Sequence, residues 1–155
     1  MKQTSYVMVK PGFANSEAVI NEVKRRLEAN GIKIEEEGFI KYDKKHADAH
    51  YHEHIGKGFF PELESYIMSD KAYGMKVSGE NAIAKIRELA GSTKNPLPGT
   101  IRYDIPQMLG VERDITANVV HSSDSVEAAK LELSIFEDLK KEQEKTSNAE
   151  SAREL

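Results

Sequence analysis

The sequence contains no cysteine, which excludes disulfide bonds, thiolate metal sites and catalysis by a thiol. No apolar run is long enough to span a bilayer, and the one near the N-terminus is too short for a signal peptide. The net charge of −4 gives no general attraction to nucleic acid or to an anionic membrane. We therefore expect a cytoplasmic protein without nucleic-acid or membrane partners, in which any polyanionic ligand needs a local basic site.

The two common glycine-rich phosphate loops, G-x-x-x-x-G-K-[ST] and G-x-G-x-x-G, are also absent, which disfavours the usual nucleotide-binding folds. What remains is a chain of 155 residues, of which 39% are hydrophobic and 31% charged. This composition is typical of one globular domain. We expect that domain over residues 1–145, followed by a polar, disordered tail over 146–155.

Hydrophobic periodicity predicts short strands that alternate with helices around a small sheet, an α/β plait in the order βαβααβα–loop–βα. The second strand is expected to carry a bulge near Gly38. Asp124 and Glu127 form a D-x-x-E pattern, which predicts a capped helix as far as Phe136. The strands are expected at 6–9, 32–40, 72–77 and 117–120, and the helices at 16–30, 43–54, 61–67, 80–90 and 124–136.

Residues 92–116 show no clear periodicity and contain three prolines and two glycines. The pattern predicts a long loop. Loops of this length in compact domains are often functional.

The densest chemical signal is the segment 118–125, Asn-Val-Val-His-Ser-Ser-Asp-Ser. It places His121 at the end of a buried strand and just before a helix, whose free N–H groups suit phosphate oxygens. Imidazole can act as a neutral nucleophile near pH 7, because its ordinary pKa is about 6.5. Glu132, two turns into the helix, can fix the tautomer of such a histidine. A structural histidine beside an ordinary capped helix is the alternative interpretation.

Three cationic side chains are candidates for phosphate binding: Lys10 at the end of a strand, and Arg87 and Arg102. Taken singly, each also fits a solvated surface position. A separate candidate is the row His46, His50 and His54, whose spacing aligns three imidazoles on a helix and can bind zinc or nickel. No carboxylate completes a known metal motif there, so a solvated helix fits this row as well.

Together these segments resemble the nucleoside diphosphate kinase family over about residues 3–136. The family signature N-V-I-H-G-S-D-S corresponds to Asn118–Ser125, and its V-K-P to Val9–Pro11. Its H-Y…K-P-F-F…L segment corresponds to His50–Leu63, and its P-G-T-I-R to Pro98–Arg102. The chain departs from the family at Gly12-Phe13, at Ser122, and in the spacing of the loop at 92–116.

The resemblance implies a ferredoxin-like core, with a small antiparallel sheet covered by helices, and a homo-oligomer, either a tetramer or a hexamer built from dimers. It implies a ping-pong reaction that moves the γ-phosphate of ATP or another nucleoside triphosphate to a nucleoside diphosphate and maintains nucleotide pools. His121 would be the phosphorylated nucleophile, oriented by Glu132 and supported by Ser123. Lys10 and Tyr51 would lie around the transferred phosphate.

The resemblance also assigns the nucleotide-binding residues. Mg²⁺ would be the cofactor, held mainly by nucleotide phosphates and water rather than by protein ligands. Two alternatives remain: a catalytically weak, regulatory nucleotide-binding module on the same scaffold, and a metal-binding protein built on the histidine row. The assigned residues are Asn118 near the phosphate and sugar, Arg87, Thr93 and Arg102 at the distal phosphates, and Phe59, Ile115 and Leu63 around the base.

Overall fold

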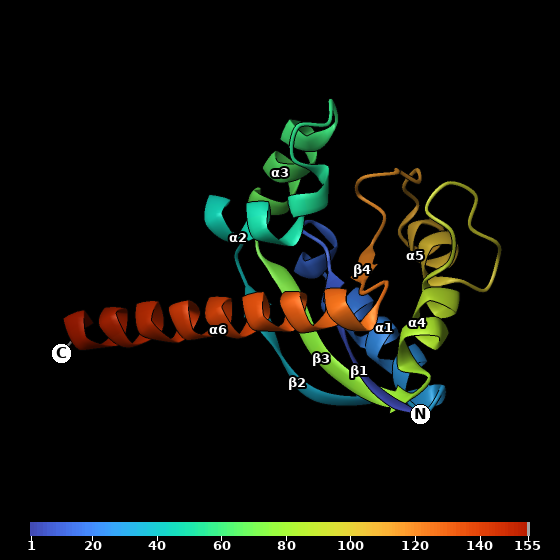
Figure 1. The fold of residues 1–155 in the computed structure, drawn as a ribbon, viewed down its shortest axis with the longest axis horizontal. Helices are drawn as coiled ribbons and strands as arrows, with labels where there is room; N and C mark the ends of the chain where they lie inside the picture. Colours follow the sequence, from blue (N-terminus) through green and yellow to red (C-terminus); the bar gives the residue numbers. More distant parts are fainter. Residues whose placement is uncertain (155) are drawn as a thin grey trace.

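A four-stranded antiparallel sheet lies at the centre of the computed structural model, which describes the backbone of residues 1–154 and the side chains of residues 1–146 (Figure 1). The strand order is β2-β3-β1-β4, so the two strands at the centre are the first and third in sequence. This is the ferredoxin-like arrangement, and it confirms the predicted fold class. The strands are β1 (Lys2–Val9), β2 (Lys33–Ile40), β3 (Ala72–Glu80) and β4 (Val120–Ser122).

Helices cover both faces of the sheet (Figure 1). Besides them there are two short 3-10 segments, η1 (Phe13–Asn15) and η2 (His52–His54). The helices are α1 (Glu17–Ala29), α2 (Lys44–His50), α3 (Phe60–Met68), α4 (Ala82–Ala90), α5 (Ile101–Leu109) and α6 (Val126–Glu154).

The alternation of side chains along β1 separates two hydrophobic cores. Val7 and Val9 point to one face and pack with α1, α4 and α5, where Leu27 and Ile86 are buried. The hydrophobic periodicity that predicted the first helix therefore corresponds to its buried face. Its predicted start is confirmed as well, because Ser16 Oγ accepts a hydrogen bond from the Val19 amide at 3.2 Å.

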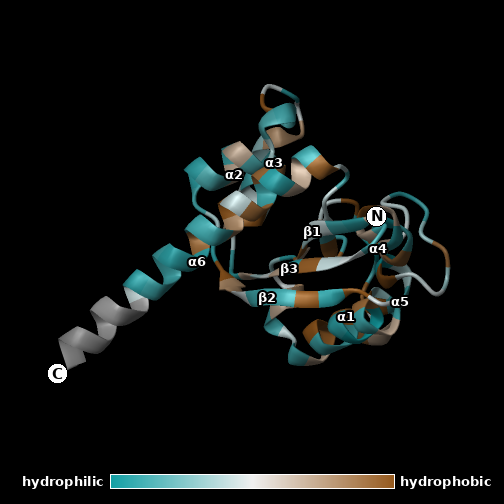
Figure 2. Cartoon of the chain, turned by 60° about the horizontal axis from the view of Figure 1, so that its bottom comes forward, coloured by the Kyte–Doolittle hydropathy of each residue, from teal (hydrophilic) through white to brown (hydrophobic). Residues whose placement is uncertain are grey.

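Tyr6 and Met8 point to the opposite face, against α2, α3 and α6. Phe136 of α6 approaches the sheet closely at Gly74, where a Cβ atom would lie 2.6 Å from the ring. A side chain at position 74 would push α6 away from the sheet, so this glycine sets the distance between the two. Residues 141–146 of α6 are exposed, and Figure 2 shows this stretch as hydrophilic.

Several predicted elements were wrong in detail. The bulge of β2 lies between Ile34 and Glu36 rather than near Gly38. The helix predicted for 43–54 ends at His50 and is followed by η2, so His54 does not continue the row of His46 and His50. The polar pattern of residues 43–54 suggested one helix, but the backbone changes conformation before the third imidazole.

The predicted loop at 92–116 contains α5, a helix of 9 residues. Pro106 lies inside this helix and removes a backbone donor, which is why the sequence pattern favoured a loop. The helix nevertheless forms because Ile101 and Ile105 are buried against the core. Tertiary packing outweighs the local cost of the proline.

The last strand and helix also differ from the prediction. β4 begins at Val120 rather than at residue 117. Ser125, and not Asp124, caps α6, because its Oγ accepts a hydrogen bond from the Ala128 amide at 3.0 Å. α6 continues past Phe136 to Glu154. The tail predicted for 146–155 falls almost entirely outside the residues whose side chains are described, so the domain boundary stays a prediction.

Candidate active site

A strained turn around Val119 directly precedes β4. Val119 has a φ of 76°, a value that β-branched residues rarely adopt. The Val120 amide donates to the carbonyl of Asn118 at 3.0 Å, which closes a three-residue γ-turn around Val119. The Lys10 amide donates to the Val119 carbonyl at 2.8 Å and ties the turn to the end of β1. This turn fixes the direction in which the next residues of β4 project.

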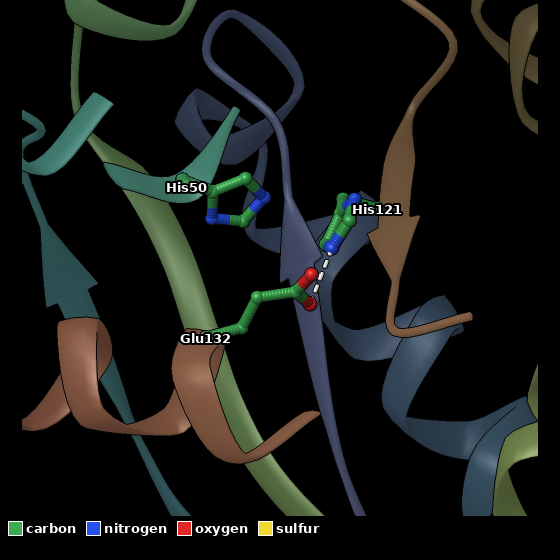
Figure 3. Close-up of side chains that lie close together, drawn as sticks. All are labelled: His50, His121 and Glu132. Atoms are coloured by element: carbon green, nitrogen blue, oxygen red, sulfur yellow. Dashed lines mark hydrogen bonds and ion pairs between the residues drawn. The ribbon is translucent and has the colours of Figure 1, made fainter. Parts of the chain in front are cut away.

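His121 lies on β4 opposite Met8 of β1, and its side chain meets a buried carboxylate. The distance from His121 Nε2 to Glu132 Oε1 is 2.7 Å (Figure 3). Ser123 Oγ donates to the same oxygen at 2.8 Å. The carboxylate oxygen can only accept, so the ring hydrogen belongs on Nε2 and Nδ1 keeps a lone pair. The arrangement leaves Nδ1 with the free lone pair that a nucleophile needs.

Lys10 supplies a buried amine near this histidine. Its Nζ donates to Asn118 Oδ1 at 2.7 Å and to the Thr116 carbonyl at 3.1 Å. Burial, together with the positive charge of Arg102, lowers the pKa of Lys10 to about 7. Both partners of the amine are neutral, so the site contains an ammonium position without a paired carboxylate.

Arg102 lies in the first turn of α5 and connects two segments of the site. Its guanidinium donates to the carbonyl of Gly91 at 2.7 Å and to that of Val120 at 2.8 Å. Burial lowers its pKa to about 10, and the neighbouring charge of Arg87 acts in the same direction. Several like charges in a partly buried region disfavour one another, and an anion in the cleft would relieve this repulsion.

These groups open into a cleft of about 1020 Å³. Ser123 is fully buried and does not line the cleft. Phe59 is 51% exposed and does not line the cleft, so the expected sandwich of a base between Phe59 and Ile115 is not assembled in this structure. The predicted site residues that line the cleft are Lys10, Tyr51, Leu63, Arg87, Thr93, Arg102, Ile115, Asn118, His121 and Glu132.

His50 also belongs to this site, although the sequence analysis gave it no role there and placed it only in the histidine row and in the family's H-Y segment. Its ring centroid lies 4.6 Å from that of His121, edge to face. Its position directly before Tyr51 in the sequence was the signal that pointed to the site. Two groups of side chains within the described residues have donor atoms close enough for a metal ion: His50, His121 and Glu132, and separately Asp43, His46 and Glu142.

A histidine oriented by a buried carboxylate, in a cleft that also contains Lys10 and two arginines, defines the class of site: one suited to accepting and releasing a phosphoryl group. The profile of the family described as Nucleoside diphosphate kinase matches residues 3–141. The chain belongs to the nucleoside diphosphate kinase family. None of the helices in the described part of the chain is both long enough and apolar enough to cross a membrane.

Individual relatives agree with this assignment. The nucleoside diphosphate kinase of Listeria monocytogenes serotype 4a (strain HCC23) is 42% identical over 139 residues, covering 88% of each chain. That of Metallosphaera sedula is 40% identical over 136 residues, covering 86% of this chain and 92% of the relative. The structure of a halophilic nucleoside diphosphate kinase from Halobacterium salinarum in complex with CDP superposes with a TM-score of 0.78 at 33% identity, covering 88% of each chain.

The predicted enzymatic function is thereby confirmed. The chain is a phosphotransferase that moves a phosphoryl group from nucleoside triphosphates to nucleoside diphosphates. The alternative of a catalytically weak binding module is not favoured by these relationships.

Proposed function

We propose that His121 carries the phosphoryl group between the two half-reactions. Nδ1 attacks the γ-phosphorus of a nucleoside triphosphate, the bond from that phosphorus to the bridging oxygen breaks, and a diphosphate leaves. A second diphosphate then attacks the phosphohistidine and regenerates the free ring. The proton on Nε2 stays in place throughout, balanced by Glu132. The observation that carries this proposal is the 2.7 Å contact between His121 Nε2 and Glu132.

The cationic groups around the cleft would hold the phosphates. Lys10, Arg87 and Arg102 are close enough to influence one another's charge, as the lowered pKa values of Lys10 and Arg102 indicate. A bound polyanion would stabilise the protonated, positively charged forms of these side chains, which burial disfavours. The phenol of Tyr51 and the amide of Asn118 would add hydrogen bonds to the transferred phosphate and the sugar, and Thr93 would bind a distal phosphate.

The base would lie between apolar side chains rather than against a hydrogen-bonding edge. Leu63 and Ile115 line the cleft, and Ile115 is 66% exposed. Phe59 would contribute its half-exposed ring from the rim. Stacking and apolar contact do not distinguish the edges of the bases, so this arrangement predicts tolerance of many nucleotides.

Mg²⁺ is the cofactor that the family implies, and the cleft residues are compatible with it. The lining includes the carboxylates of Glu53, Glu88, Asp124 and Glu127. Mg²⁺ prefers oxygen ligands and retains several waters, so these carboxylates would accept hydrogen bonds from its water shell. The bound ion would neutralise charge on the phosphates.

We also propose a homo-oligomer. Exposed apolar side chains gather in and around α5, at Leu97, Met108, Leu109 and Val111. Contiguous exposed apolar surface often marks a protein interface. A monomer in sedimentation or light-scattering measurements would contradict the proposal, and the measured mass would distinguish a tetramer from a hexamer.

The proposed role of His121 is tested by incubation with γ-labelled ATP and Mg²⁺. The protein should retain label that survives alkali, is lost in acid and moves to an added diphosphate. His121→Ala should bind nucleotide without retaining label, whereas His46→Gln, a histidine outside the cleft, should still be labelled. Labelling of His121→Ala would refute the assignment.

A further inference from the structure

His50 presents a buried nitrogen that has no partner among the described residues. The side chain is only 7% exposed, and its Nε2 makes no hydrogen bond. The other nitrogen, Nδ1, lies 3.1 Å from the hydroxyl of Tyr42. Figure 3 shows one ring nitrogen of His50 directed toward His121. A buried polar atom without a partner is costly, and at an active site it suggests a role in another state of the reaction.

The neighbouring tyrosines determine whether this nitrogen is a donor or an acceptor. The hydroxyl of Tyr6 lies 3.1 Å from that of Tyr42, and both are buried. If Tyr6 donates to Tyr42 and Tyr42 donates to His50 Nδ1, both hydroxyl hydrogens are used. If the chain runs the other way, the hydrogen of Tyr6 has no acceptor among the described residues. The first direction is therefore favoured, and it places a hydrogen on His50 Nε2.

The charge around His50 suits an anion. Burial lowers the pKa of His50 well below its usual range, and the nearby charges of His121 and Lys10 act in the same direction. The ring is therefore neutral at physiological pH and donates from Nε2 alone. A transition-metal ion bound by His50, His121 and Glu132 would require the opposite tautomer and would be repelled by Lys10.

We propose that His50 Nε2–H donates a hydrogen bond to an oxygen of the phosphoryl group on His121, an inference that rests on the proposed phosphorylation of that residue. Tyr6 and Tyr42 position the donor by holding the tautomer. The hydrogen bond forms only once the phosphoryl group arrives, and the proton remains on His50. His50 thereby favours the phosphoenzyme over free enzyme and triphosphate.

The test compares two substitutions, each of which keeps a polar group at the position of one of the two imidazole nitrogens. In His50→Gln the amide nitrogen reaches the Nε2 position and keeps the donor. In His50→Asn the side chain reaches only the Nδ1 position, so it keeps the contact with Tyr42 and loses the donor. The equilibrium constant for E + ATP ⇌ E–P + ADP is measured for both by quench of labelled enzyme. His50→Asn should lower it by about tenfold, the usual effect of one hydrogen bond to a charged group, and His50→Gln should restore most of the loss.

A spectroscopic measurement on the wild-type protein gives an independent readout. Long-range ¹H–¹⁵N spectra should show hydrogen on His50 Nε2 in the free enzyme, and that signal should move downfield on phosphorylation. If wild type is labelled normally but both variants keep its equilibrium constant, the inference about His50 is wrong while the proposed function stands. If Nε2 carries no hydrogen, or binds added Zn²⁺, the inference is likewise overturned. Absence of label on wild type would overturn both.

Discussion

Nucleotide binding should take up a proton at Lys10 when the pH is above 7. In the free protein the pKa of Lys10 is lowered to about 7, chiefly by burial. At pH 8 only about one in ten molecules then carries the charge, whereas bound phosphates restore the usual ammonium. Binding should therefore take up about 0.9 proton at pH 8 and about 0.1 at pH 6. Since the bound state holds more protons, affinity should fall nearly tenfold per pH unit above pH 8.

The proton uptake is measured by titration calorimetry with ADP and Mg²⁺ in buffers of different ionisation enthalpy. The slope of the observed enthalpy against the buffer enthalpy gives the number of protons. Lys10→Met serves as the control, because it retains the length of the side chain and removes the titrating group. The difference between wild type and this variant also subtracts any proton exchanged by the nucleotide itself. Equal slopes for the two proteins at pH 8 would refute the argument that burial leaves Lys10 uncharged.

Two further predictions concern the geometry around His121. Glu132→Gln should slow phosphoenzyme formation by about tenfold or more in single-turnover experiments, because the substitution weakens a charge-assisted hydrogen bond to His121. The Kd for nucleotide should stay unchanged. An equal loss of nucleotide binding would contradict an orienting role for Glu132. Val119→Gly should be at least as stable to denaturant as Val119→Ala, because glycine accepts a φ of 76° without strain. Elsewhere glycine is usually less stable than alanine by about 0.5–1 kcal/mol, and finding that order here would rule out strain at the turn.

The elements that follow simple periodicity were predictable from the sequence. The first helix has Val19, Val23 and Leu27 at helical spacing, and they form its buried face. Capping by Ser16 was also predictable, because serine is a preferred capping residue and its side chain bonds to an amide only three residues further along the chain. α5 was not predictable in this way, because Pro106 opposes a helix locally and the burial of Ile101 and Ile105 against the core compensates.

The site shows the same division between local and non-local information. His121 on β4 and Glu132 near the start of α6 are only 11 residues apart in the sequence, so their contact could be predicted. The γ-turn at Val119 could not, because the Lys10 amide that ties it to β1 is more than a hundred residues distant in the sequence.

The proposed role of His50 depends on residues that are distant in the sequence, since the direction of its hydrogen bond is set by Tyr6 on β1 and by Tyr42 in the connection between β2 and α2. The sequence alone shows that His50 directly precedes Tyr51 in the family's H-Y segment. The hydrogen bond that gives one of them a defined tautomer appears only when the chain is folded. A histidine in the middle of a polar segment, for which a solvated helix was the favoured interpretation, is therefore a buried side chain in the folded protein, with one ring nitrogen directed toward His121.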